Sequence, residues 1–242
     1  MMTKETIGRY WNARAASFDA QGDHAIHGDE ERSAWLRLLD RLAPPGQILD
    51  VLDVGCGTGF LALLFAERGH RVSGSDLAPE MIARAQAKAK AAGLGATFVV
   101  GDAEAPDWPD GSFDLIVSRH LFWTLPHPEQ ALAEWVRLLR PAGRVAIVDG
   151  EWREPGVPAV AATTGGTYDK ETEAALPFLG GAPAERVAEL LSSRGLANVR
   201  IESLDAIVAA QRARALAEGR EPRDYVRYCV WGERPRPPAR SP

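Results

Sequence analysis

The chain of 242 residues has little cysteine and no long apolar stretch. Its two cysteines, Cys56 and Cys229, cannot form a disulfide framework, so we expect a reducing compartment, the cytoplasm. No apolar run approaches the roughly 18 residues that a membrane-spanning helix needs, and the first ten residues do not resemble a signal peptide. These absences favour a cytoplasmic protein with no membrane partner.

Basic clusters and metal-ligand patterns are also scarce. The net charge is -5, and the only dense group of basic residues is the proline-rich tail at 234–240, which we expect to be a frayed terminus. A nucleic-acid partner is therefore not expected. His24 and His27 lie three residues apart, but no group of cysteines or carboxylates completes a metal site around them. We expect no metal.

Apolar runs alternate with segments of helical periodicity, which indicates a mostly parallel sheet with helices on both faces. Strands are expected at residues 47–54, 71–75, 97–100, 113–118, 144–149, 199–204 and 225–231, and helices at 61–68, 79–92, 128–140 and 184–194. Residues 4–43 show helical spacing broken near 22–23, whereas 151–181 show none. The prediction is a single doubly wound, seven-stranded α/β domain. Its parts are a helical cap (1–46), a ligand-binding core (47–150), and an insertion with the completion of the sheet (151–242).

A glycine-rich turn connects the first expected strand to its helix. Gly55, Gly57 and Gly59 allow a tight bend and a close approach of ligand to backbone, as in nucleotide sites at helix starts. A dinucleotide fingerprint would have glycine or alanine where this chain has Phe60, and the carboxylate of Asp53 beside the turn would repel a pyrophosphate. These two residues disfavour a nicotinamide cofactor and favour a cationic sulfonium ligand.

Acidic residues follow the next two expected strands. Asp76, about 20 positions beyond the turn, is placed to bind both ribose hydroxyls, and Asp102 is placed to accept from an adenine amino group. Each has a plainer alternative, because aspartate is a favoured helix N-cap and a common turn residue. Their occurrence in register at successive strand ends favours a bound nucleoside.

Together these segments resemble the class I S-adenosylmethionine-dependent methyltransferases, in particular the small-molecule branch related to ubiquinone and menaquinone enzymes. The resemblance is carried by the segments at residues 52–59 (LDVGCGTG), 74–81 (GSDLAPEM), 101–103 (GDA), 110–114 (DGSFD) and 138–143 (LLRPAG). It departs from the family at Ala142, where a second glycine is usual. It is close over residues 48–149 and looser elsewhere.

The resemblance implies a set of donor contacts and a Rossmann-like methyltransferase fold. Asp53 and the turn residues Gly55, Cys56, Gly57, Thr58 and Gly59 would hold the amino acid end of S-adenosylmethionine. Asp76 would bind the ribose, and Asp102 and Ala103 the adenine, with Leu77 and Met81 packed on its ring. S-adenosylhomocysteine would be the product.

The acceptor side is less defined. His120 follows the fourth expected strand and is the candidate general base, although it could instead contact the donor or cap a turn. Ser118 and Arg119 are candidate donor contacts, and Arg119 could equally be a solvated surface residue.

Aromatic residues are candidates for the walls of the acceptor pocket. Phe122, Trp123 and Trp152 could line it or could be ordinary core residues. An N-terminal lid, or simple helix packing, is expected for the cap, with Tyr10 and Phe18 against the donor and Trp11, His24 and His27 against the acceptor. Asp149 and Glu151 are further candidates for binding or base roles.

The predicted function is methyl transfer from S-adenosylmethionine to oxygen or nitrogen of a small molecule, mainly by alignment of the reactants. A nucleic-acid or protein methyltransferase, and a non-catalytic S-adenosylmethionine-binding protein, remain alternatives. The acceptor's identity is open, as is the choice between monomer and homodimer.

Overall fold

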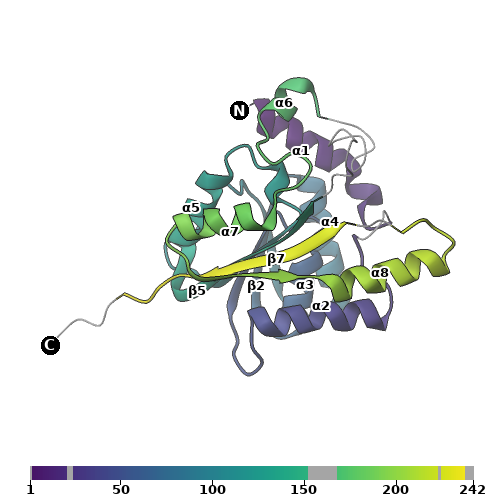
Figure 1. Cartoon of the computed structure of the whole chain (residues 1–242), viewed down its shortest axis with the longest axis horizontal. Coiled ribbons are helices and arrows are strands. Elements are labelled where there is room, and N and C mark those ends of the chain that lie inside the picture. Colours follow the sequence, from purple (N-terminus) through teal and green to yellow (C-terminus); the bar gives the residue numbers. More distant parts are fainter. Residues whose placement is uncertain (1, 21–23, 152–167, 223–224, 238–242) are drawn as a thin grey trace.

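Seven strands form one sheet in the order β3-β2-β1-β4-β5-β7-β6 (Figure 1). The computed structural model describes residues 2–20, 24–151, 168–222 and 225–237. The strands are β1 Asp50–Val54, β2 Arg71–Asp76, β3 Ala96–Val100, β4 Phe113–Arg119, β5 Leu139–Glu151, β6 Ala197–Ser203 and β7 Val226–Glu233. Strands β1 to β5 pair in parallel, while β7 is antiparallel to both β5 and β6. The predicted fold class is confirmed.

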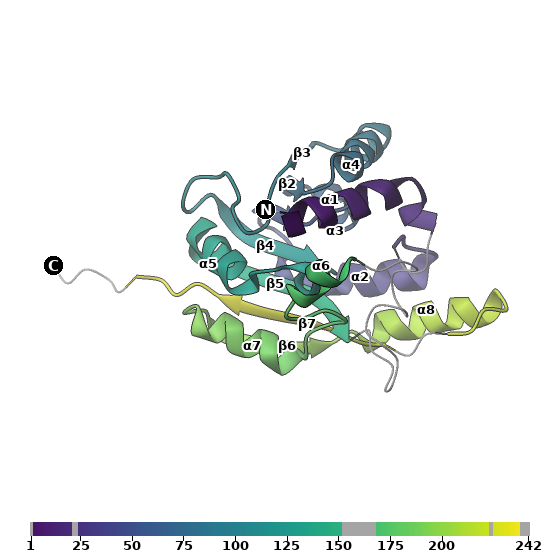
Figure 2. The same ribbon diagram turned by 90° about the horizontal axis from the view of Figure 1, so that it is seen from above.

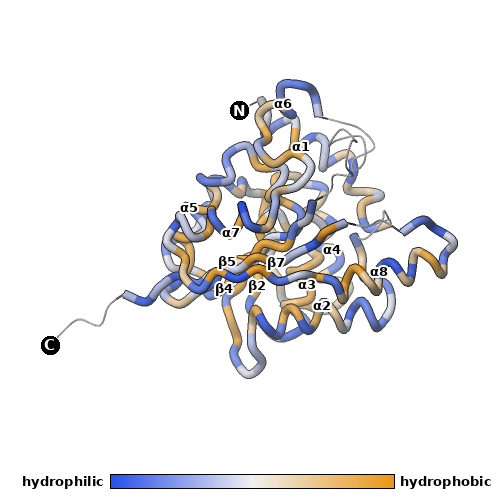
Figure 3. Tube along the Cα trace, in the orientation of Figure 1, coloured by the Kyte–Doolittle hydropathy of each residue, from blue (hydrophilic) through white to orange (hydrophobic). Residues whose placement is uncertain are grey.

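Helices cover both faces of this sheet. They are α1 Met2–Arg14, α2 Asp29–Leu42, α3 Phe60–Glu67, α4 Pro79–Ala92, α5 Pro128–Leu138, α6 Lys170–Ala174, α7 Ala184–Ser193 and α8 Asp205–Ala217, with 3-10 turns η1 Ala15–Ala20 and η2 Phe122–Thr124. Alternate strand residues point to opposite faces. Val51 and Val117 therefore join the core beneath α2, α3 and α8, whereas Leu52 and Ile116 join the core beneath α5 and α7. Apolar residues gather on the central strands (Figure 3).

The order of the strands reverses at β1, which pairs with β2 on one side and β4 on the other. Asp53 lies beside Gly74 of β2 and Val117 of β4 in register. In an open parallel sheet the crevice beyond the carboxyl ends at this position is where ligands bind. The glycine turn and the candidate acids all follow strands that end here.

The N-terminal segment lies across the carboxyl ends of the strands. Helix α1 packs beside α4 and α6, as the view from above shows (Figure 2). The N-cap of α4 is Ala78, which has no side-chain acceptor. Asn12 of α1 supplies one, because its Oδ1 accepts a hydrogen bond from Glu80 N at 2.8 Å. An N-terminal helix is present as predicted, whereas α2, which the predicted cap at residues 1–46 also included, packs on a face of the sheet.

Two helices were not predicted. Short α6 falls within the segment 151–181, where we expected no periodicity, and residues 152–167 of that segment lie outside the described part of the chain. Helix α8 buries Ile207, Gln211 and Ala215, which are spaced four residues apart as a helix requires. A glutamine and an alanine in the buried stripe hide the apolar repeat from sequence analysis.

Strand β5 also differs from expectation. Residues 141–143 were predicted as a turn before a strand at 144–149, but β5 is continuous from Leu139. The irregularity appears instead as a bulge, because Phe113 pairs with Leu139 whereas Leu115 pairs with Arg144. Ala142 in this bulge has φ of 66°, in the left-handed region. Among the described residues, no helix has the length and apolarity of a membrane span.

The Ala142→Gly substitution is expected to stabilise the protein. The left-handed conformation costs a residue with a Cβ roughly 1–2 kcal/mol, and glycine's greater freedom in the unfolded chain offsets part of the gain. We expect a net increase of about 0.5–1 kcal/mol in the free energy of unfolding, measured by urea denaturation. Ala83→Gly, at an exposed position within α4, is the control and should lower stability by about 1 kcal/mol. A loss of stability in Ala142→Gly would contradict this account of the bulge.

Candidate functional site

The glycine turn is built as a cradle between β1 and α3. Gly55 and Gly57 have φ of 65° and 53°, and Gly59 caps α3 in the left-handed conformation. A Cβ on Gly57 would meet only the ring of Phe18, at 3.8 Å, so its surface faces open space. A Cβ on Gly55 would collide with Leu121 at 2.7 Å. The turn therefore needs glycine at Gly55 for packing and presents bare backbone at Gly57.

Asp53 lies beneath this turn and is buried. Its Oδ2 accepts a hydrogen bond from Ala62 N of α3 at 2.9 Å. Burial raises the pKa of this carboxyl to about 7, while the hydrogen bond from Ala62 and the positive charge of Arg119 oppose that shift. Asp53 thus fastens α3 to β1. Its direct contact with a ligand stays a prediction.

Asp76, at the end of β2, joins the turn to the neighbouring strand. Its Oδ2 accepts from Gly57 N and its Oδ1 from Ala78 N, both at 2.9 Å. Burial raises the pKa of this carboxyl, and the backbone hydrogen bonds act in the opposite direction. Each oxygen can accept a further hydrogen bond, which suits a diol such as ribose.

Asp102 follows β3 and is half-buried. Its Oδ1 accepts from Glu104 N at 2.9 Å, and its Oδ2 lies 2.7 Å from the ammonium of Lys4 in α1. Ala103 is half-buried beside it, and its carbonyl accepts from Trp135 Nε1 at 2.9 Å. Lys4 was not singled out from the sequence, because nothing local connects it to residues about a hundred positions away.

The cap lies directly over the residues predicted to surround the adenine. A Cβ on Gly8 of α1 would lie 3.5 Å from Leu77. Met81 is buried in a small cluster with Ala15, against which Trp11 and Phe18 pack. Tyr10 packs against Tyr168 with ring centroids 4.9 Å apart. The placement of the cap agrees with the predicted lid, and contact of its residues with a donor stays a prediction.

A polar junction fastens η1 to the glycine turn. Thr58 Oγ1 donates to Asp19 Oδ1 at 2.5 Å, and Lys88 of α4 reaches both Asp19 Oδ2 at 3.0 Å and Thr58 Oγ1 at 3.1 Å. Cys56 and Thr58 are both buried. Sequence analysis missed Asp19 and Lys88, since neither belongs to a motif.

Ser118 and Arg119 end β4 and point to opposite faces of the sheet. Ser118 is buried, and its hydroxyl has no hydrogen-bond partner within the described residues. The Arg119 guanidinium stacks on Phe60, 3.8 Å from the ring centroid, and lies 5.8 Å from that of Trp35. The alternative of a solvated surface arginine is therefore wrong. Phe60, which replaces the third small residue of a dinucleotide fingerprint, is the platform for this stack.

His120 is held in a strained backbone conformation immediately beyond β4. Its φ is 56°, and its backbone N–H donates to Val148 O at 2.9 Å. The His24 ring lies 6.3 Å from that of His120 and stacks on Phe18 at 4.0 Å. Burial, reinforced by the positive charges of Arg119 and Arg227, holds the pKa of His120 well below its usual value. His120 is therefore neutral at pH 7 and able to accept a proton.

Aromatic residues gather beside His120. Trp123 is buried with Tyr168, whose hydroxyl lies 2.9 Å from Thr124 Oγ1. Phe122, the first residue of η2, is buried and stacks on Phe178 with ring centroids 5.5 Å apart, so it belongs to the core. Tyr168 was missed because it lies alone in an aperiodic segment. Trp152 lies outside the described residues.

For the other residues predicted to contact the acceptor, the structure gives only their burial and their contacts within the protein. Asp149 is buried and accepts from Phe122 N at 3.1 Å and from Gly150 N at 2.9 Å, so it orders the start of η2. Glu151 and His27 are exposed, and the backbone N–H of His27 donates to Glu31. Their acceptor contacts stay predictions.

A buried polar network supports this side of the crevice. Glu31 of α2 accepts from Gln211 Nε2 of α8 at 2.6 Å, and Gln211 in turn accepts from Arg227 of β7. Arg214 lies 3.9 Å from Glu31. These residues were not predicted, because α8 was not. Glu31 of this network also accepts from the backbone N–H of His27, three residues after His24.

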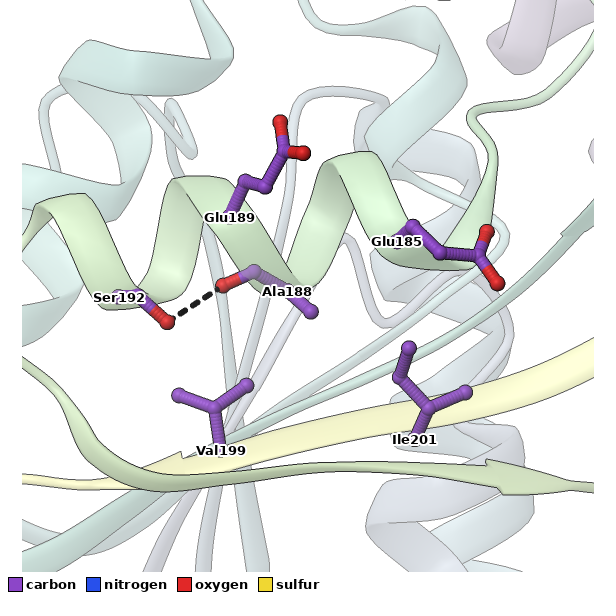
Figure 4. A pocket seen from close by; sticks show the side chains of 6 residues that line it. All are labelled: Glu185, Ala188, Glu189, Ser192, Val199 and Ile201. Atoms are coloured by element: carbon purple, nitrogen blue, oxygen red, sulfur yellow. Dashed lines mark hydrogen bonds between the residues drawn. The ribbon is translucent and has the colours of Figure 1, made fainter.

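A shallow groove lies elsewhere, between α7 and β6 (Figure 4). It measures about 620 Å³ and is lined by Glu185, Ala188, Glu189, Ser192, Val199 and Ile201. None of the predicted site residues contributes to it. No cluster of metal-ligating side chains occurs in the described ranges.

Known methyltransferases match the part of the chain that contains the glycine turn and the candidate acids. A family model described as a methyltransferase domain matches residues 52–147. The demethylmenaquinone methyltransferase of Thermus thermophilus is 38% identical over 149 residues, which are 61% of this chain and 65% of that protein. This chain thus spans just under two thirds of that relative's length.

Solved structures share the fold at low identity. Phosphoethanolamine N-methyltransferase 2 of Haemonchus contortus, in complex with S-adenosylmethionine, has a TM-score of 0.71 at 17% identity, covering 97% of this chain and 60% of that one. The [4+2]-cyclase SpnF has a TM-score of 0.69 at 20% identity, covering 97% of each chain. The matched segment begins in β1 and ends in β5, so it contains the glycine turn and the strand ends that carry Asp76, Asp102 and His120. Residues 52–147 therefore form a methyltransferase domain of the class I S-adenosylmethionine-dependent type.

Proposed function

We propose that the protein transfers the methyl group of S-adenosylmethionine to an oxygen or nitrogen atom of a small molecule. The observation that carries this proposal is the hydrogen bond from Gly57 N to Asp76 Oδ2 at the reversal of strand order. It joins a bare backbone cradle to a carboxylate suited to ribose. Asp102 at the next strand end supplies an acceptor for an adenine amino group.

The residues present fit such a donor. The open face of Gly57 leaves room for the methionine portion, where a branched side chain would not. The buried hydroxyl of Ser118 has no partner in the described structure and could bond a ligand's amino or carboxylate group. Acids dominate the crevice, which suits the positive charge of a sulfonium.

Alignment is the main contribution to catalysis in this proposal. The bound donor supplies an electrophilic methyl group on a cationic sulfur. Holding an acceptor atom in line with that methyl group can contribute roughly 7–11 kcal/mol in well-oriented intramolecular cases. His120, neutral at pH 7, would take the proton of an acceptor hydroxyl or amine as the new bond forms.

A small, flat acceptor suits the surroundings of His120 better than a macromolecule does. The cap lies over the crevice, and Trp11 and Trp123 lie together with ring centroids 6.1 Å apart. The net charge of -5 disfavours nucleic acid. The fold alone does not determine the reaction, because the cyclase SpnF shares it. Location in the cytoplasm, and a monomer or homodimer, remain part of the proposal.

The proposal is tested with purified protein, S-adenosylmethionine labelled in its methyl group, and a small-molecule extract. We expect label to appear in a compound of low molecular mass, identified by mass spectrometry. Heat-denatured protein is the control. Tight binding of S-adenosylmethionine with no labelled product would favour the non-catalytic alternative, and label in RNA or protein would favour the macromolecular one.

Asp76→Asn is expected to weaken donor binding. The amide keeps one acceptor oxygen and replaces the other by a donor NH₂, so either Gly57 N or Ala78 N loses its acceptor, and a ribose hydroxyl loses its charged partner. We expect affinity for S-adenosylhomocysteine to fall about tenfold, or about 1.4 kcal/mol, by titration calorimetry. The exposed Asp110→Asn is the matched control. Unchanged affinity in Asp76→Asn would remove Asp76 from the ribose role.

His120→Ala is expected to lower turnover while sparing donor affinity. We expect kcat to fall about 10²-fold or more, which is typical of a lost general base. Because the folded pKa of His120 is lowered, the wild-type base stays neutral as pH decreases to values that would half-protonate a free histidine, about 6.5. Wild-type kcat should therefore lose its base-dependent part only below that pH. Equal turnover in His120→Ala would exclude the base role.

A further inference from the structure

Lys4 connects the cap to the strand end that carries Asp102. Its ammonium lies 2.7 Å from Asp102 Oδ2 and 2.6 Å from Glu104 Oε2. Glu104 is buried and also holds the start of α5, because its Oε1 accepts from His127 N at 2.5 Å. The ammonium thus lies between a buried acid and a partly exposed acid that follows β3.

The position of Lys4 is not explained by helix formation. It lies in the first turn of α1, where the helix macrodipole disfavours a positive charge. The pair of acids offsets that cost, and both ion pairs are partly shielded, since the Lys4 side chain is 27% exposed and that of Glu104 is 1% exposed. Removing the ammonium would leave two neighbouring carboxylates that repel each other.

Asp102 has capacity for one more partner on its open side. Glu104 N occupies one lone-pair site of Oδ1 and Lys4 one of Oδ2, and the side chain is 31% exposed. A carboxylate fixed on both oxygens has little freedom to turn away. That is the property required of a group that must accept a hydrogen bond at one point in space.

Other contacts fasten the same cap without touching Asp102. Asn12 caps α4, and Asp19 binds Thr58 in the glycine turn. The N-terminal segment is therefore fastened at the base-binding end, at the middle, and at the amino acid end of the proposed donor crevice. Of these three contacts, the one made by Lys4 includes Asp102, the residue predicted to bind the adenine amino group.

We propose that Lys4 is a positioning residue for recognition of the adenine amino group. It holds the Asp102 carboxylate in place, so that selection for a 6-amino purine depends on the ion pair between Lys4 and Asp102 and not on the docking of α1 in general. This inference rests on the proposed function, because it assumes that Asp102 faces the donor's base.

The test compares binding of S-adenosylhomocysteine with that of its purine-riboside analogue, in which hydrogen replaces the 6-amino group. Titration calorimetry gives the affinity ratio for wild type, Lys4→Met, Lys4→Arg and Asn12→Ala. We expect wild type to favour the 6-amino ligand by about tenfold or more. In Lys4→Met the ratio should fall to about twofold or less, and Lys4→Arg should restore most of it.

Asn12→Ala is the matched control, since it loosens the same helix while leaving Asp102 and Lys4 intact. It should weaken both ligands by the same factor and keep the wild-type ratio. Thermal melting of each variant confirms that it is folded, and Lys4→Gln replaces Lys4→Met if the latter is not.

The outcomes separate the two proposals. An unchanged ratio in the folded Lys4 variant, or an equal loss of ratio in Asn12→Ala, would overturn the role of Lys4. A wild-type ratio near one would overturn it as well, by removing Asp102 from base recognition. Failure of wild type to bind S-adenosylhomocysteine at all would instead overturn the proposed function.

Discussion

The hydrogen bond between Gly57 N and Asp76 Oδ2 is the constraint on which the candidate site depends. It spans two adjacent parallel strands where the chain leaves β1, so it sets the distance between the backbone cradle and the acid of β2. Asp53 fixes the other side of the turn by accepting from Ala62 N of α3. Because both contacts use backbone N–H groups, these two acids fix the shape of a turn whose left-handed conformations require its glycines.

Electrostatics divides the crevice into two parts. The part beside β1, β2 and β3 contains Asp53, Asp76 and Asp102. In the part beyond β4 and β7, burial lowers the pKa of His120, and the positive charges of Arg119 and Arg227 act in the same direction. Arg119 also opposes the rise in the pKa of Asp53. Under the proposed function, a positively charged donor would lie in the first part and an uncharged base in the second.

Features that depend on residues close together in the chain could be predicted from the sequence, whereas those that depend on distant residues could not. The strand, glycine turn and helix at 50–67, and the acids at Asp76 and Asp102, are set by local spacing and were readable. Lys4, Asp19 and Arg227 were not, because each acquires its role from residues distant in the chain. Helix α8 was not predicted, because the polar residue Gln211 lies in the middle of its buried face. There Gln211 donates a hydrogen bond to Glu31.

The difference between local and distant interactions also explains where the family resemblance ends. The matched segment, residues 52–147, contains the glycine turn and the acids Asp53, Asp76 and Asp102. Trp11, His24, Tyr168 and Arg227 lie outside that segment, although the fold brings them to the end of β4 or into the cap above it. The demethylmenaquinone and phosphoethanolamine enzymes that resemble this chain differ in the compound that their names give. Under the proposed function, the choice of acceptor would therefore depend on the side chains outside the matched segment that gather around His120.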